Sequence, residues 1–232
     1  MPETNQSVKR RRHPTEGLKL FKPVPPSQNH LIQRIEQLRR SLSPRDAKTL
    51  SENTGALYEA LDDRSGVFHV PVWNQPLTVS YPSFVSRHPE TGREAAPPIQ
   101  ALLLYYFTTA DGAPLTGQWI SFSELPDGKF YQQAFQGYTG AELGRTFQDD
   151  KNAFIKAATS LRGETQLLGD TAFSFLALPR VPVLAVLWQG DEDFPASYRI
   201  LFDQSAPHYL PADVYAIVGS MLTRKLIGAK PS

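Results

Sequence analysis

Residues 171–203 read TAFSFLALPRVPVLAVLWQGDEDFPASYRILFD, and this stretch decides the fold of the chain. It contains three β-rich runs, Thr171–Leu178, Val183–Gln189 and Tyr198–Asp203, joined by short connections. Because connections this short cannot hold a crossover helix, neighbouring strands must run antiparallel. The middle run is apolar at odd and even positions alike, so we expect an interior strand with both faces covered.

The two turns of this meander lie at opposite ends of its middle strand. Arg180, in the first turn, therefore shares one end of the sheet with Asp203 and with His208, which follows the last strand. We expect an ion pair between Arg180 and Asp203. The second turn, residues 190–195, lies at the other end of the middle strand. The predicted meander therefore does not bring the polar residues of both turns together in one site.

Three consecutive carboxylates occupy the second turn: Asp191, Glu192 and Asp193. Like charges this close repel one another unless water or a counter-charge neutralises them. In one interpretation they are hydrated turn residues, since Asp favours turns for local hydrogen-bonding reasons. In the other they form an oxygen-ligand site for a hard cation or an anchor for a basic partner.

The rest of the body predicts helices around this sheet. The expected helices cover residues 29–40, 43–54, 99–110, 139–147, 151–161 and 211–228. A hairpin joins Val67–Val72 to Leu77–Tyr81, with an edge position implied by its prolines, and Trp119–Phe122 is a short extended piece. The fold class is α+β: an antiparallel meander sheet with a C-terminal three-strand unit, covered by helices. Extension of the sheet by the hairpin is left open.

Local signals set several helix boundaries. Ser43 is expected to cap the second helix, with Pro44 at its first position and Asp46 in its first turn. Thr139 and Glu142 have the spacing of a capping box. Residues 99–110, IQALLLYYFTTA, have no polar face; their length and the preceding Pro-Pro favour a buried helix, with a buried strand as the alternative.

Composition excludes several classes of protein. The 232 residues are 41% hydrophobic and 20% charged, a globular balance with a formal net charge of +1. Cysteine is absent, which excludes disulfides, thiolate metal sites, cysteine nucleophiles and iron–sulfur clusters held by cysteine. The longest apolar run, residues 101–107, is far too short for a membrane helix. We expect a soluble cytoplasmic protein that does not associate with membranes.

The N-terminal 28 residues differ from the body in charge. They carry a net charge of +4, leaving −3 for residues 29–232, and contain the run Lys9, Arg10, Arg11 and Arg12. We interpret residues 1–28 as a disordered, basic, proline-containing tail, residues 29–228 as a single domain and residues 229–232 as a C-terminal tail. The basic run either aids solubility or contacts nucleic acid weakly.

Familiar catalytic motifs are missing. The chain contains no phosphate loop, dinucleotide fingerprint, HExxH zinc motif, EF-hand loop or GxSxG nucleophile elbow. Its five histidines are scattered singly, without the spacing of zinc ligands, so no metal ligand is assigned.

Aromatic and acidic residues around the meander complete the set of candidates. We expect Trp188, and Trp119 with Phe122, to fill the core beneath the sheet. Glu124 faces either a cleft or water, and only burial would raise its pKa. No residue is assigned as catalytic. The candidate ligand-binding residues are Trp119, Glu124, Arg180, Asp191, Glu192, Asp193, Asp203 and His208.

Several blocks resemble the prokaryotic family known as domain of unknown function 3786. The matching stretches are Leu102–Phe107, Pro114–Leu125, Gly169–Asp170, Leu178–Pro182, Leu187–Pro195, Leu201–Asp203 and Tyr209–Pro211. The resemblance implies one intact domain found in bacteria and archaea, and it supplies no activity, cofactor or catalytic residue. Some members of the family carry cysteine-rich iron–sulfur segments, from which this cysteine-free chain departs.

Two functional hypotheses follow. The favoured one is a non-catalytic binding or accessory module for a small molecule or a protein partner, because a complete globular body lacks a catalytic motif. The alternative is a metal-assisted hydrolase that uses Asp191, Asp193, Asp203 or His208.

Overall fold

A computed structural model describes residues 28–43 and 45–231 of the chain. The tail predicted for residues 1–28, with its basic run Lys9–Arg12, lies outside the described residues except for Gln28, where α1 begins. Pro44 and Ser232 lie outside them as well. Among the described helices, none has the length and apolar character needed to span a bilayer.

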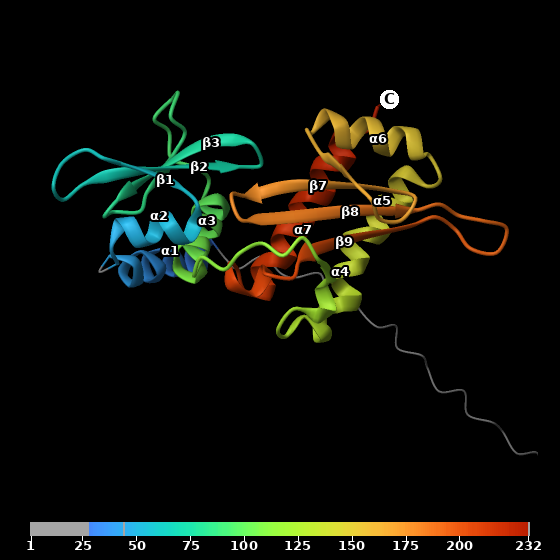
Figure 1. The fold of residues 1–232 in the computed structure, drawn as a ribbon, viewed down its shortest axis with the longest axis horizontal. Coiled ribbons are helices and arrows are strands. Elements are labelled where there is room, and N and C mark those ends of the chain that lie inside the picture. Colours follow the sequence, from blue (N-terminus) through green and yellow to red (C-terminus); the bar gives the residue numbers. More distant parts are fainter. Residues whose placement is uncertain (1–27, 44, 232) are drawn as a thin grey trace, which may run out of the picture.

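The described chain contains both helices and antiparallel strands, as Figure 1 shows. The α-helices are α1 (Gln28–Leu42), α2 (Ala47–Thr54), α3 (Pro97–Thr109), α4 (Gln132–Tyr138), α5 (Gly140–Phe147), α6 (Lys151–Ser160) and α7 (Ala212–Gly228). Short 3-10 helices are η1 (Phe122–Glu124), η2 (Gly128–Tyr131) and η3 (Ala206–His208). The strands are β1 (Leu57–Ala60), β2 (Gly66–Val72), β3 (Gln75–Tyr81), β4 (Ser86–Arg87), β5 (Trp119–Ser121), β6 (Glu164–Gln166), β7 (Thr171–Leu178), β8 (Val181–Trp188) and β9 (Ser197–Asp203).

The strands form two separate antiparallel sheets. The first has the order β1-β2-β3-β4 and the second the order β5-β9-β8-β7-β6. The α+β class and the antiparallel meander β7-β8-β9 are therefore confirmed. The hairpin β2-β3 does not extend the meander, because it pairs with β1 and β4 instead. The meander gains β5 and β6 at its two edges.

Strand β8 lies at the centre of the second sheet, as its unbroken apolar run predicted. Val183 pairs with both Phe175 and Phe202. Val183, Ala185 and Leu187 face the main core, and Leu184 and Val186 face the opposite side. All five side chains are completely buried. Short connections and continuous apolarity were thus sufficient to place this strand.

Helices α4 to α7 cover one face of the second sheet. In Figure 1, α7 crosses behind β7, β8 and β9. Val214, Val218 and Leu222 of α7 are buried on the side of the helix that faces the core. Ile217 is 52% exposed because it lies on the outer side of the helix.

The β2-β3 hairpin turns at Trp73 and Asn74, which have φ angles of 49° and 62°. Two central residues with positive φ are typical of a tight two-residue hairpin turn. Next to the turn, Pro71 pairs with Pro76. The two prolines lie beyond the residues that pair with β1 and β4, so no ladder hydrogen bond is lost on their outer sides. The prediction of an edge position therefore holds only next to the turn. Farther from the turn, β2 and β3 pair with β1 and β4 on their outer sides.

Helix α3 connects the two sheets. Phe107 lies 4.8 Å from Phe68 of β2, and Tyr106 lies 6.1 Å from Tyr209, just after η3, between ring centroids. One buried apolar cluster contains all four residues and extends from α1 to α7. The helix predicted for residues 99–110 is confirmed, and its lack of a polar face has a physical reason: α1, β2 and the segment after η3 pack against it.

Two predicted helix caps are wrong. Helix α2 is capped by Asp46, whose side chain accepts the backbone N–H of Thr49 at 2.9 Å, and not by Ser43. Helix α5 begins at Gly140 without a capping box, because the Thr139 hydroxyl donates backwards to the carbonyl of Phe135 in α4 at 2.6 Å. Since α4 runs almost directly into α5, a helical carbonyl is the nearer partner.

Candidate functional site

Arg180 lies in the β7-β8 turn and binds backbone carbonyls. Its guanidinium donates to Glu52 O at 3.1 Å and to Gly112 O at 3.3 Å. The backbone N–H of Arg180 donates to Tyr106 Oη at 3.1 Å. The predicted ion pair between Arg180 and Asp203 does not form. The carbonyls of α2 and of the segment after α3 take the guanidinium instead.

Asp203, at the end of β9, is only 2% exposed. Its carboxylate accepts the N–H groups of Thr116, Gly117 and Ser205 at 3.1, 2.7 and 2.9 Å, and the Thr116 hydroxyl at 3.1 Å. Burial alone would raise the pKa of Asp203, but the hydrogen bonds from Ser205, Thr116 and Gly117 outweigh it, so the pKa is lowered. The four donors make this carboxylate a structural acceptor with little capacity left for a ligand.

His208 and Asp111 form an exposed pair. His208 Nδ1 lies 2.7 Å from Asp111 Oδ2, and about half of each side chain is exposed. The hydrogen bond from His208 lowers the pKa of Asp111. The other oxygen of Asp111 accepts the N–H of Ala113 at 3.0 Å, and Tyr209 donates to the carbonyl of Ala113.

Arg180, Asp203 and His208 therefore all act on one segment, the loop of residues 111–118 between α3 and β5. The sequence correctly placed Arg180 and Asp203 at one end of the sheet. It did not show that all three side chains contact a loop 68 to 97 residues earlier in the chain, because such contacts leave no spacing pattern. We interpret these three candidates as a clamp on this loop.

The opposite end of the second sheet is acidic. Asp191 Oδ1 accepts the N–H groups of Asp193 and Phe194 at 2.9 and 2.8 Å, which fixes the turn between β8 and β9. Two further carboxylates bind the same connection: Asp170 accepts Gln189 N at 2.9 Å, and Asp149 accepts Gly190 N at 2.8 Å. Asp149 and Asp170 were not among the candidates; the pair Asp149-Asp150 was the available signal in the sequence.

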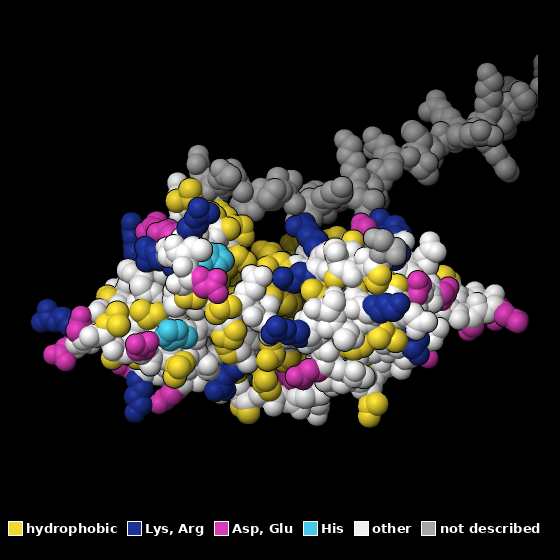
Figure 2. Space-filling model, turned by 90° about the horizontal axis from the view of Figure 1, so that it is seen from above, with side chains coloured by type: hydrophobic (Ala, Val, Ile, Leu, Met, Phe, Trp, Pro, Cys, Tyr) yellow, Lys and Arg dark blue, Asp and Glu magenta, His cyan; other side chains and the backbone are white. Residues whose placement is uncertain are grey.

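We call this region the acidic end, with six carboxylates: Asp149, Asp150, Asp170, Asp191, Glu192 and Asp193. Among the described residues, none of the six lies within 4 Å of a lysine, arginine or histidine nitrogen. Figure 1 shows the β8-β9 connection projecting beyond the sheet, and Figure 2 shows acidic side chains at the same extremity of the molecule. Phe194 on this connection is 72% exposed, and Leu167 in the neighbouring β6-β7 loop is fully exposed.

Phe122 is buried in the main core, as predicted. The prediction that Trp119 and Trp188 fill the core beneath the sheet is wrong. Both are partly buried on the opposite face of the sheet, where they pack on a second apolar cluster of Ala172, Leu184, Val186 and Leu201. The guanidinium of Arg199 lies 5.6 Å from the Trp188 ring. Because β8 is apolar on both sides, the tryptophans serve as the cover of its outer face.

Glu124 faces water. It is exposed, and its carboxylate accepts Ser121 N and the Ser121 hydroxyl, each at 2.7 Å, closing a capping box at η1. The hydrogen bonds from Ser121 lower the pKa of Glu124, the opposite of what burial would do. We interpret Glu124 as a local structural residue.

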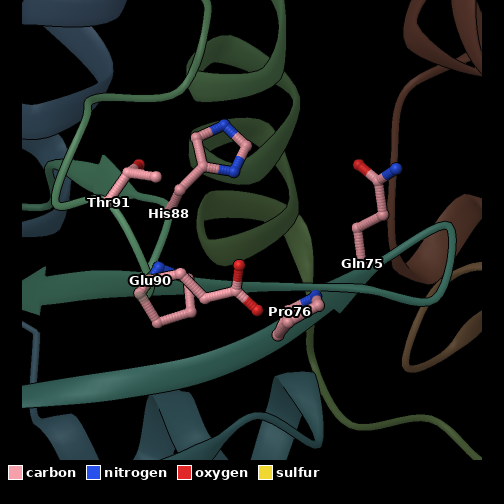
Figure 3. A pocket seen from close by; sticks show the side chains of 6 residues that line it. Gln75, Pro76, His88, Glu90 and Thr91 are labelled. Atoms are coloured by element: carbon pink, nitrogen blue, oxygen red, sulfur yellow. The ribbon is translucent and has the colours of Figure 1, made fainter.

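A hollow of about 220 Å³ lies on the first sheet, away from every candidate residue. Its walls come from the start of β3 and the loop after β4: Gln75, Pro76, His88, Pro89, Glu90 and Thr91. Figure 3 shows Gln75 and His88 on either side of the hollow and the carboxylate of Glu90 extending towards Pro76. No two of the labelled side chains are hydrogen-bonded to each other, so the hollow lacks an assembled catalytic group.

The described residues contain no cluster of side chains that could form a metal centre. Nowhere in residues 28–43 and 45–231 do three or more His, Asp or Glu side chains lie close enough together to hold a metal ion. The metal-assisted hydrolase therefore has no ligand set in this part of the chain.

The model of a family described as "Domain of unknown function (DUF3786)" matches residues 46–225. The chain belongs to this family. The match includes both sheets, the 111–118 loop and the projecting connection of the acidic end. No protein of curated function matches the DUF3786 chain, and neither does any solved structure.

Proposed function

We propose that this DUF3786 chain is a non-catalytic binding module of the prokaryotic cytoplasm that takes a basic segment of a protein partner at its acidic end. One observation supports this proposal above the others. Six carboxylates gather at a projecting extremity, none of them within ion-pair distance of a cation among the described residues, and an exposed phenylalanine lies beside them.

The geometry suits recognition better than catalysis. The connection is already fixed by Asp149, Asp170 and Asp191, so little conformational freedom remains to be lost on binding. Glu192 and Asp193 have no side-chain hydrogen bond to another described residue, which leaves both carboxylates available to a partner.

The expected affinity is modest and depends on salt. An exposed ion pair contributes about 0.2–1 kcal/mol, so several must act together. An apolar contact is also needed, and Phe194 is the natural anchor because aromatic side chains contribute strongly at interfaces. Raising the ionic strength should weaken the electrostatic part, since exposed charges are screened.

The test is a titration of the full chain with a fluorescent peptide of about fifteen residues that combines Lys and Arg with Leu. We expect saturable binding that weakens as salt is added. The double variant Glu192→Gln and Asp193→Asn should reduce the affinity about three- to tenfold, as expected for the loss of two exposed ion pairs. Phe194→Ser should reduce it as well, without a change of charge.

The matched control is the double variant Asp63→Asn and Glu90→Gln, which removes two exposed carboxylates outside the acidic end. It should bind the peptide as the unaltered chain does. Equal loss in the two double variants would mean that only net charge matters. An unchanged affinity in the Glu192 and Asp193 variant would remove the acidic end from the binding surface.

A further inference from the structure

The turn of the β2-β3 hairpin lies against an open part of the β7 edge. On that edge β6 pairs with residues 172–174, and among the described residues no strand lies beside residues 175–178. Trp73 N donates to the carbonyl of Ala177 at 3.0 Å. Figure 1 shows the turn next to the end of β7. A turn of the first sheet therefore covers an edge that the second sheet leaves open.

A β-bulge in β7 prepares this contact. The register of β7 against β8 shifts between Leu176 and Leu178, so Ala177 is an extra residue without a partner in β8. The extra residue of a bulge is left out of the ladder of hydrogen bonds. Because Ala177 is completely buried, its carbonyl needs a donor within the protein, and the backbone N–H of Trp73 provides one.

Three features weaken the contact between the turn and β7. Trp73 has a φ of 49°, which is rare and unfavourable for a bulky residue. Its indole Nε1 is buried without an acceptor among the described residues, whereas water would satisfy it in an open turn. A hollow of about 30 Å³ also lies beside the ring, so the packing is incomplete. In the described part of the chain, the bond to Ala177 is the only backbone hydrogen bond between the two sheets.

The Trp73 ring provides the attraction that opposes these terms. Leu161, Phe175 and Leu222 line the hollow with it, and the Lys225 ammonium lies 5.9 Å from the ring centroid. Apolar burial and the cation–π contact both favour the closed turn. The favourable and unfavourable terms thus arise from one side chain and offset each other, so the closed turn is only slightly favoured.

The rest of the hairpin does not have to move when the turn opens. Residues 70–77 pair only with each other, because β1 and β4 reach no further than the residues before and after them. Val70, Val72 and Leu77 are buried in the main core and hold the two strands in place. Opening is therefore confined to the turn itself.

We propose that the β2-β3 turn is a latch that guards the edge of β7. When closed, it satisfies the Ala177 carbonyl and covers the edge. When open, without unfolding of either sheet, it hydrates the indole and uncovers residues 175–178. An uncovered edge is a template for pairing with another chain, so the latch prevents copies of this chain from associating through β7. The latch is independent of the acidic end.

Hydrogen exchange of single amides, followed by NMR at low urea concentrations, measures the opening in the unaltered chain. We expect the Trp73 amide to exchange at least a hundredfold faster than the amides of β8. Its rate should not change with urea, because a local opening exposes little new surface. If the Trp73 amide showed the protection and the urea dependence of β8, the turn would open only on global unfolding and there would be no latch.

Two glycine variants separate the role of the ring from that of the turn. Trp73 and Asn74 both have positive φ, 49° and 62°, so glycine relieves the backbone at either position. Only Trp73→Gly removes the ring. It should lower the protection factor of the residue 73 amide at least tenfold, and it should cause self-association that increases with concentration in sedimentation velocity. Asn74→Gly, whose side chain is exposed, should do neither. Equal protection in the two variants, or equal self-association, would overturn the latch.

Discussion

At the scale of single residues, the buried Asp203 carboxylate shows how a candidate site residue becomes a structural one. In the sequence, Asp203 is a charged residue at the end of a strand with an arginine nearby, so an ion pair was the simplest expectation. The structure instead surrounds it with the N–H groups of Thr116, Gly117 and Ser205. Local turns could be predicted from the sequence. The N–H donors of Thr116 and Gly117 could not, because they lie in a loop more than eighty residues earlier in the chain.

The variant Asp203→Asn tests this role. An amide provides one oxygen in place of two and adds donors where donors already converge. Hydrogen bonds to a charged group are worth about 1.5–3 kcal/mol, so we expect the free energy of unfolding at pH 7 to fall by about 2–3 kcal/mol, measured by urea denaturation. The exposed control Asp213→Asn, at the start of α7, should change it by less than about 0.5 kcal/mol.

The destabilisation caused by Asp203→Asn should become smaller at low pH. Because hydrogen bonds lower the pKa of Asp203 in the folded state, its ionised form stabilises the fold above the unfolded value of 3.8. That stabilisation is lost as the pH falls below 3.8 and through the lower folded pKa. The difference between the variant and the unaltered chain should therefore be constant from pH 5 to pH 7 and narrow below pH 4. A difference that stayed constant down to pH 2 would contradict the role of the charge.

At the scale of elements, local patterns determined what could be predicted. The meander and the hairpin were found because short connections force neighbouring strands to pair. The additions of β5 beside β9 and of β6 beside β7 were missed, because each is only three residues long. Trp119 and Trp188 were assigned to the wrong face for a related reason: a strand that is apolar on both sides does not reveal which side the helices cover.

The β6-β7 loop covers part of that outer face, and Gly169 permits the close approach. Its φ is 60°, and an added Cβ would lie 2.7 Å from Val186 Cγ1 and 2.8 Å from the carbonyl oxygen of Leu187. Gly92 has a similar φ of 67° but no atom within 4 Å of such a Cβ. Gly169→Ala should therefore destabilise the protein by about 1–3 kcal/mol more than Gly92→Ala, since both pay the backbone cost and only one clashes.

Thermal or urea unfolding of the two alanine variants makes this comparison. The emission of Trp188 should also change in Gly169→Ala, because the loop would have to move away from its ring. Equal destabilisation by both substitutions would mean that the loop does not press on the outer face.

At the scale of the whole molecule, the question is whether two sheets make one domain. Residues 29–228 were predicted to form a single domain, and we keep that prediction for experiment. The physical argument for it is α3, whose Tyr106 and Phe107 belong to one buried cluster shared by both sheets. Tyr106 also donates to Thr54 of α2 and accepts from Arg180 of the β7-β8 turn, so a polar link accompanies the apolar one.

Phe107→Ala tests this unity. Phe107 is completely buried, with Phe68 and Phe84 of the first half around it, so its removal should cost about 3–5 kcal/mol. In a single cooperative domain, this loss of unfolding free energy also lowers the protection of residues that Phe107 does not contact. Hydrogen exchange in increasing urea, followed by mass spectrometry, should show β2 and β8 losing protection at the same concentration, shifted equally by the substitution. If β2 alone became exposed while β8 kept the protection of the unaltered chain, the two sheets would be separate folding units.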